Sequence, residues 1–189
     1  STNGQAGFVL SKGSLTTNTS NEGEIRKALI ENDLIDCIVN LPAKLFLNTQ
    51  IPACLWFLRR NKQKQKRKIL FIDARNLGFL VNRRTKELAD DDIKKIADTY
   101  HNWRTGEAKY ADIAGFCKET TIEEVKAINY VVTPGRYVGL PDDEEDFNFA
   151  ERFSALKKEL QKQIGEEDAL NKRIANNLSK INANEYQNS

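Results

Sequence analysis

The stretch LIDCIVNLPAKLFLNTQIPACLWFL, residues 34–58, decides the fold. It contains two apolar runs, 34–41 and 53–58, separated by a connection that begins at Pro42. Continuous apolar runs of this length are typical of strands that are buried on both faces of a sheet. The connection is too short for a helical crossover, so we expect the two strands to be antiparallel.

The connection itself is unusually apolar, because it carries Leu45, Phe46, Leu47 and Ile51. Loops run over the surface and most are polar, so an apolar loop usually contacts something. Three explanations are open at this point. The loop is a buried crossing, a surface for a partner, or the wall of a pocket for a flat ligand.

The flanking sequence extends this pattern into an α/β sheet. Upstream, AGFVL (residues 6–10) predicts a further buried strand, and the apolar periodicity that starts at Glu22 predicts a helix. The helix cap is either Thr19 with Glu22 or Asn21 with Glu24. Downstream, KILFIDA (residues 68–74) predicts another strand, and strand–helix–strand order indicates an α/β fold.

Residues 81–146 are more polar and predict a smaller extension. Asp90 or Asp91 is expected to cap a helix, and Thr120 with Glu123 forms the expected capping box of a second helix. A turn at Pro134–Gly135 interrupts the extended segment that follows.

Residues 147–183 carry apolar side chains at spacings of mostly three and four, which predicts a long amphipathic helix. The alternative is a hairpin of two helices that folds at Gly165 and buries its own stripe. A single helix of this length cannot bury its stripe alone and therefore needs a partner. The stripe consists of Phe153, Leu156, Leu160, Ile164, Leu170, Ile174 and Leu178.

Composition excludes several classes of protein. Charged residues make up 30% of the chain, and no apolar run is long enough to span a membrane. The three cysteines form no C-x-x-C pair and suit a reducing cytoplasm. There is one histidine, no G-x-G-x-x-G motif and no P-loop, so the sequence offers no catalytic constellation and no metal site.

Two charge runs stand out against a net charge of +2. DDEED (residues 142–146) lacks the alternation and the glycine of a calcium loop, so we interpret it as a solvated acidic face. RRNKQKQKRK (residues 59–68) holds seven basic side chains and no acid. It is either a contact for nucleic-acid phosphates or the solvated tip of a hairpin between two strands.

The order of the motifs adds a family resemblance. The strings NTS-x-EGEIRK, F-x-x-TQIP-x-CLWFL and TPGRYVG occur in sequence, and nearly the whole chain resembles the methylation (M) subunit of type I restriction–modification systems. This resemblance implies the distal half of a doubly wound, Rossmann-like class I methyltransferase sheet followed by a C-terminal helical region. The expected segments are 1–80 for the methyltransferase part, 81–146 for the extension and 147–183 for assembly.

The resemblance also implies an activity. Subunits of this family transfer a methyl group from S-adenosylmethionine to adenine N6 in DNA. Their glycine-rich cofactor loop and N/D-P-P-Y/F tetrapeptide do not occur in the 189 residues. We therefore expect a C-terminal fragment of an adenine-specific methyltransferase that is inactive and binds no cofactor alone. The alternative is a non-catalytic module for subunit docking or DNA binding.

Residue roles follow from the same resemblance. Phe46 lies where related enzymes carry the aromatic side chain that stacks on the flipped-out target base. The apolar stripe of the last helix is expected to dock on the DNA-specificity subunit, and a second M subunit, the restriction subunit and double-stranded DNA are the other expected partners. The expected phosphate contacts are Arg59, Arg60, Lys62 and Lys64.

Overall fold

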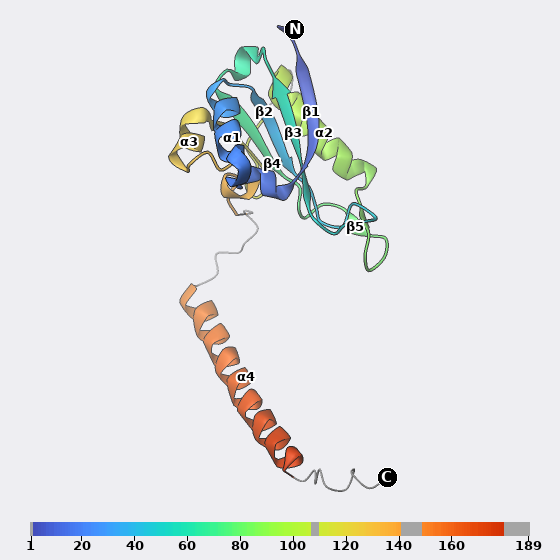
Figure 1. The fold of residues 1–189 in the computed structure, drawn as a ribbon, viewed down its shortest axis with the longest axis vertical. Helices are drawn as coiled ribbons and strands as arrows, with labels where there is room; N and C mark the ends of the chain where they lie inside the picture. The colour runs from blue at the N-terminus through green and yellow to red at the C-terminus, as the bar shows by residue number, and fades with distance from the viewer. Residues whose placement is uncertain (1, 107–109, 141–148, 180–189) are drawn as a thin grey trace. The chain divides into compact units, whose positions relative to one another are not determined.

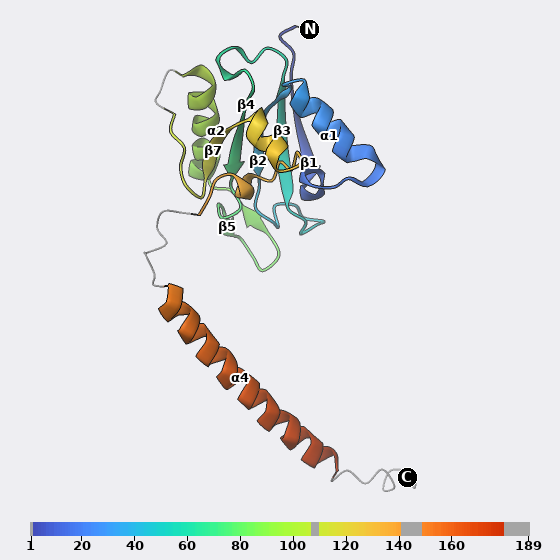
Figure 2. The same cartoon turned by 90° about the vertical axis from the view of Figure 1, so that its left-hand side faces the viewer.

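The structure, a computed structural model, describes residues 2–106, 110–140 and 149–179. The chain divides into two compact units, residues 1–143 and 144–189, which we describe separately (Figures 1 and 2). The first unit contains both the expected methyltransferase part and the expected extension, because a strand from each pairs in one sheet.

The first unit is built on a mixed sheet with the strand order β1–β3–β2–β4–β7. The central pair β2 and β4 is parallel, and every other pair of neighbours is antiparallel, as expected for β2 and β3. The strands are β1 (Gln5–Ser11), β2 (Ile35–Asn40), β3 (Ala53–Arg59), β4 (Lys68–Asp73) and β7 (Cys117–Thr121). Because β2 lies between β3 and β4, residues 60–67 cross over the end of β2 and do not form a hairpin tip.

Helices cover the two faces of this sheet. The helices α1 (Glu22–Glu31) and α3 (Ile122–Ala127) lie on one face, and α2 (Asp90–Thr105) lies on the other (Figures 1 and 2). Successive side chains of a strand point to opposite faces. Accordingly, Ile38 and Phe71 belong to the core under α1 and α3, whereas Val39 and Leu70 belong to the core under α2.

The strand β1 differs from its expected environment. Its position is as predicted, but all seven of its residues are exposed, so the prediction of a buried strand is wrong. The reason is topological. β1 is an edge strand of the described sheet, with β3 on one side only, and no described helix covers it fully. Phe8, Val9 and Leu10 therefore reach solvent.

The predicted helix caps are displaced. Asn21 precedes α1 in a left-handed conformation, and its side chain makes no capping hydrogen bond. The cap position of α2 is Ala89, and Asp92, not Asp90 or Asp91, bonds the backbone there. The capping box of α3 is formed by Thr121 and Glu124, one position later than expected. The turn at Pro134–Gly135 is present as a short 3-10 helix, Pro134–Arg136.

Among its described residues, 149–179, the second unit contains one helix, α4 (Phe149–Leu178), which is 30 residues long. The helix runs through Gly165 without a break, so the alternative of a hairpin folded at this glycine is wrong. Each residue from 153 to 178 is exposed within the described structure.

Candidate functional site

The loop that joins β2 to β3 projects its apolar side chains into solvent. Leu47 is 90% exposed, Ile51 61% and Phe46 42%, and only Leu45 packs partly against the core under α2. The first of the three explanations, a buried crossing, is therefore wrong. A partner surface or a pocket wall accounts for the loop.

Local hydrogen bonds give this loop a defined shape. A β-bridge joins Phe46 and Thr49, and the hydroxyl of Thr49 accepts a hydrogen bond from the backbone N–H of Ile51. Lys44 adopts a left-handed conformation with φ of 69°, which is uncommon for a side chain other than glycine, asparagine or aspartate. The apolar tip is thus presented by an ordered turn.

Polar side chains gather beside this loop, at the carboxyl ends of the parallel strands. Asn40 and Asp73 end β2 and β4 and are paired in the ladder. The amide of Asn40 donates to Asp73 Oδ1 at 3.3 Å, and Arg75 forms an ion pair with Asp73 at 2.7 Å. A Cβ atom on Gly135 would lie 2.8 Å from the guanidinium group of Arg75 and 2.9 Å from the carboxylate of Asp73, so a side chain there would displace this ion pair.

The basic segment separates into buried and exposed side chains. Arg59 is 7% exposed and bonds Asp36 through Nε at 3.1 Å and a terminal nitrogen at 2.8 Å. Lys62 is 2% exposed and donates to Asp33 at 2.6 Å and to the carbonyls of Ile35 and Lys68. Burial lowers the pKa of Lys62. These two side chains hold the crossover together, which corrects the expectation that they contact phosphate.

Arg60 and Lys64 remain available on the outside of the same crossover. Both are exposed. Their backbones are fixed, since Arg60 N–H bonds the carbonyl of Gly4 and the short 3-10 turn Gln63–Gln65 contains Lys64. The side chain of Gln65 anchors this turn by donating to the carbonyl of Trp103 at 2.9 Å.

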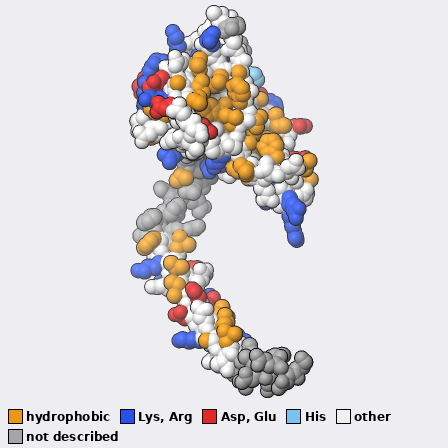
Figure 3. Space-filling model, viewed as in Figure 1, with side chains coloured by type: hydrophobic (Ala, Val, Ile, Leu, Met, Phe, Trp, Pro, Cys, Tyr) orange, Lys and Arg blue, Asp and Glu red, His pale blue; other side chains and the backbone are white. Residues whose placement is uncertain are grey.

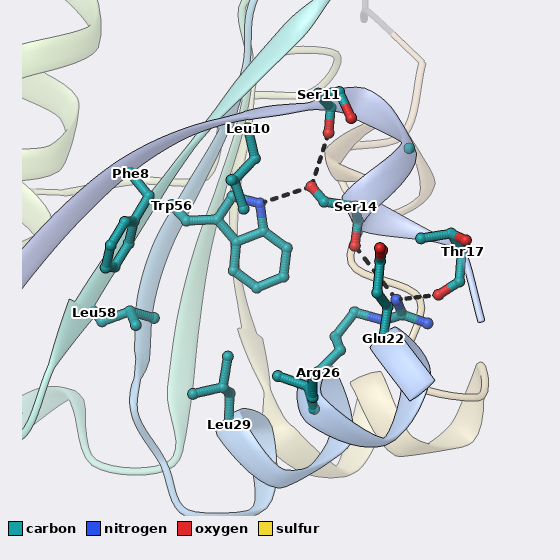
Figure 4. Close-up of a pocket in the computed structure, with 12 residues that line it drawn as sticks. Phe8, Leu10, Ser11, Ser14, Thr17, Glu22, Arg26, Leu29, Trp56 and Leu58 are labelled. Carbon is teal, nitrogen blue, oxygen red and sulfur yellow. Dashed lines mark hydrogen bonds between the residues drawn. The ribbon is translucent and has the colours of Figure 1, made fainter. Parts of the chain in front are cut away.

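A groove of about 690 Å³ lies between α1 and the strands β1 and β3 (Figure 4). Phe8, Leu10 and Leu58 of the strands face Leu29 of α1 across it, so its lining is mostly apolar. Figure 3 shows apolar side chains gathered over this part of the first unit.

One rim of the groove is rigid and polar (Figure 4). Arg26 donates to the carbonyls of Thr17 and Tyr130, each at 2.8 Å, and Trp56 donates to the hydroxyl of Ser14 at 3.2 Å. Burial lowers the pKa of Arg26. Arg26 thus binds the loop after β1 to the segment after α3 and has little capacity left for a ligand.

The cysteines and acids form no reactive or metal-binding cluster in the described part of the chain. Cys37, Cys54 and Cys117 are buried as free thiols, and burial raises the pKa of each. In the described residues, no helix has both the length and the apolar character needed to cross a membrane.

The stripe on α4 is the other large apolar surface. Its seven members lie on one side of the helix and are each at least half exposed. They are the residues expected from sequence: Phe153, Leu156, Leu160, Ile164, Leu170, Ile174 and Leu178.

A hairpin that sequence patterning does not single out lies next to the Phe46 loop. It consists of β5 (Phe79–Leu80) and β6 (Lys86–Glu87), and Lys86 N–H bonds the carbonyl of Lys44 at 2.8 Å. The adjacent pair Arg83 and Arg84 at its tip is its only signal in the sequence.

Known proteins resemble this chain along most of its length. The chain is 49% identical over 179 residues to the type I restriction enzyme HindI methylase subunit of Haemophilus influenzae. The matched residues make up 94% of this chain and 40% of that protein. It is 42% identical over 174 residues to the MjaIX methylase subunit of Methanocaldococcus jannaschii, covering 91% of the chain and 31% of that protein. The chain therefore spans less than half the length of these relatives.

A solved structure shares the fold. The methyltransferase subunit of a type I restriction–modification system from Streptococcus thermophilus superposes with a TM-score of 0.62 at 31% identity, over 72% of this chain and 27% of that chain. These likenesses confirm the resemblance to type I methylation subunits and the α/β fold. The model of the N-6 DNA methylase family matches residues 1–146, which include the whole sheet and the Phe46 loop. The chain belongs to the N-6 DNA methylase family.

Proposed function

We propose that this chain is part of the methylation subunit of a type I restriction–modification enzyme, which transfers a methyl group from S-adenosylmethionine to adenine N6 in DNA. The observation that carries the proposal is the exposed aromatic side chain of Phe46 on an ordered loop beside the carboxyl ends of β2 and β4. The 49% identity to a type I methylase subunit supports it.

Phe46 has the properties of a stacking platform for a flipped base. A methyltransferase must extrude its target adenine, because the amino group is paired and stacked inside the duplex. An extruded base loses its stacking, and an aromatic side chain returns about 1–3 kcal/mol per base. Phe46 is 42% exposed and is absent from both hydrophobic cores, so its ring is available to a base.

The exposed side chains Arg60 and Lys64 are the proposed phosphate contacts of the basic segment. Clustered basic side chains supply the salt-dependent part of DNA affinity. Arg59 and Lys62 stabilise the same segment, because their ion pairs with Asp36 and Asp33 fix the backbone that carries Arg60 and Lys64.

We propose that other methylase residues cover the β1 edge. Sheets of doubly wound proteins carry helices on both faces, and strands in their middle pair on both sides. β1 pairs only with β3 among the described strands, and the groove between β1 and α1 has an apolar lining. A neighbouring strand and an amphipathic helix of the longer methylase fit these two surfaces.

Two features of the described residues argue against a site for S-adenosylmethionine within this chain alone. Asn40 and Asp73, the polar side chains at the carboxyl ends of β2 and β4, are buried; Asn40 donates to Asp73, which is also paired with Arg75. The groove beside α1 is mostly apolar, and its arginine is already engaged by backbone carbonyls. We therefore propose that methylase residues outside these 189 bind the cofactor and that this chain alone is inactive.

The stripe on α4 favours a docking role in addition to the enzymatic one. A helix of 30 residues with seven exposed apolar side chains on one face is suited to packing against helices of another subunit. We propose the DNA-specificity subunit as that partner. A second methylation subunit, the restriction subunit and the DNA duplex would complete the assembly.

The test is methyl transfer by the full-length subunit assembled with its specificity subunit. Tritium-labelled S-adenosylmethionine and duplex DNA are the substrates, and digestion of the product identifies the methylated base. We expect N6-methyladenine. If the assembled complex binds DNA but labels cytosine or no base, the proposal fails.

A further inference from the structure

The hairpin β5–β6 is a rigid projection at the end of the first unit that carries the Phe46 loop. At its base, the carboxylate of Asp92 accepts hydrogen bonds from the backbone N–H groups of Gly78 and Ala89, both at 3.0 Å. Gly78 has φ of 79°, and a Cβ atom there would lie 2.5 Å from the carbonyl of Glu87, so the close return of the second strand requires glycine. The base of the hairpin is therefore held to the first turn of α2 by hydrogen bonds.

The tip of the hairpin is also locked. The side-chain oxygen of Asn82 accepts hydrogen bonds from the N–H groups of Arg84 and Thr85, both at 2.8 Å, and Val81 N–H bonds the carbonyl of Thr85 at 3.0 Å. An asparagine used in this way holds a turn without help from the rest of the protein. Arg83 and Arg84 are thus displayed from a fixed backbone.

The side chains of Arg83 and Arg84 are exposed, and neither takes part in an ion pair among the described residues. Figure 3 shows basic side chains projecting from the place where Figure 1 draws the hairpin. Phe79, Leu80 and Val81 beside them are each more than half exposed. The projection therefore offers positive charge at its tip and apolar surface along its side.

The hairpin and the Phe46 loop form one structural element through Lys44. The carbonyl of Lys44 accepts from Lys86 N–H at 2.8 Å, and its ammonium group donates to the carbonyl of Arg83 at 3.2 Å. These two hydrogen bonds also hold Lys44 in its left-handed conformation, two residues before Phe46. The positions of the basic tip and of the aromatic side chain are consequently coupled.

We propose that this hairpin contacts the DNA backbone beside the flipped adenine, with Arg83 and Arg84 binding phosphates. Lys44 sets the position of Phe46 relative to these two arginines. The inference rests on the proposed function. When a base is extruded, its sugar and phosphates stay at the entrance of the pocket that binds the base. The positive charges of Arg83 and Arg84, fixed next to the ring of Phe46, therefore lie where the distorted backbone passes. Arginine suits this role because its planar group binds phosphate through two parallel hydrogen bonds.

The test measures the salt dependence of DNA affinity for the assembled full-length methylase, with a fluorescent duplex of random sequence as probe. Each lost phosphate contact makes the slope of log K against log salt shallower by roughly 0.9. The double variant Arg83→Gln, Arg84→Gln should flatten the slope by roughly 1.8. Between about 50 and 200 mM salt the wild type then loses roughly 12-fold more affinity than the variant.

Two further variants make the result specific. Lys27→Gln with Lys126→Gln removes the same charge from α1 and α3, on the face of the sheet opposite α2, and should leave the slope unchanged. Arg83→Lys with Arg84→Lys keeps the charge and should restore most of the slope while losing the paired hydrogen bonds.

An unchanged slope for the glutamine variant overturns the inference. So does an unchanged slope combined with poorer copurification of another subunit, which would identify the hairpin as a protein contact. Methylation of adenine by the wild-type complex is measured in parallel. If the wild type methylates adenine and the slope does not change, the inference fails while the proposed function stands.

Discussion

Replacing Asp36 by asparagine should strongly destabilise the first unit. The carboxylate of Asp36 is fully buried and accepts three hydrogen bonds, two from Arg59 at 2.8 and 3.1 Å and one from the hydroxyl of Tyr100 at 2.7 Å. It thereby joins β2, β3 and α2. In the variant the guanidinium group of Arg59 stays buried without a counter-charge, because the side-chain oxygen of asparagine can accept its hydrogen bonds but carries no charge, and Gln65 at 3.4 Å is its other side-chain partner.

The expected loss is about 3–5 kcal/mol, which is the cost of removing one partner from a buried ion pair. Asparagine has nearly the shape of aspartate, so no cavity contributes to this value. For a unit of this size each kcal/mol lowers Tm by roughly 2–4 °C, so the melting temperature should fall by roughly 6–20 °C.

Urea unfolding followed by tryptophan fluorescence measures this loss. The two tryptophans, Trp56 and Trp103, are buried in the two cores on opposite faces of the sheet, so the signal reports the first unit without α4. Glu123→Gln is the control, because it breaks the exposed pair with Arg67 and should change stability little. If the unfolding midpoint of Asp36→Asn equals that of Glu123→Gln, the buried pair does not hold the sheet as argued.

Four further outcomes are expected. Phe46→Ala should lower kcat/KM for methylation by roughly 5- to 160-fold, which is the equivalent of about 1–3 kcal/mol of stacking. Its Tm should stay unchanged, and a large fall in Tm would instead make Phe46 a core residue. Arg60→Gln with Lys64→Gln should flatten the salt slope of DNA binding by roughly 1.8, and an unchanged slope would exclude phosphate contact. Leu156→Asp with Leu160→Asp should abolish copurification with the specificity subunit without altering the fluorescence of the first unit, and copurification at wild-type yield would rule out docking through α4. The three buried cysteines, whose thiol pKa values burial raises, should react with a thiol reagent at neutral pH only after urea is added, and fast labelling of the folded chain would contradict their burial.

The strands β1 to β4 and the helices follow from sequence because their signal is local, whereas β5, β6 and β7 are not predicted. Continuous apolar runs predict β2, β3 and β4, and the structure places each of them within a residue or two. The caps were harder to predict, because neighbouring polar residues offer equivalent alternatives, and Thr121 rather than Thr120 caps α3.

The environments of the elements do not follow from local pattern. An apolar run does not reveal whether a second strand is present to bury it, and this is why β1 was expected inside the sheet. The basic segment shows the same limit. Arg59 and Lys62 look like solvent-exposed charges until their partners Asp36 and Asp33 are known, and these partners lie 23 and 29 positions away.

The candidate site likewise contains features with a local sequence signal and features that depend on tertiary contacts. The sequence draws attention to Phe46 because an apolar loop is a local anomaly, and to the stripe on α4 because its period is helical. Their roles rest on the family resemblance and stay predictions. The sequence does not predict that the hairpin with Arg83 and Arg84 lies beside the Phe46 loop, because no spacing encodes its two hydrogen bonds to Lys44.

The open side of β1 has a consequence for handling the isolated chain. An edge strand with unpaired backbone groups and exposed apolar side chains is a template for strand addition by another molecule. The glycine, phenylalanine, valine and leucine of residues 7–10 carry no charge that would oppose such pairing. Purified alone, the chain should therefore form oligomers through β1 as its concentration rises. The substitution Val9→Lys should delay that self-association without disturbing either core, because Val9 is 60% exposed and a lysine there places a charge on the edge strand.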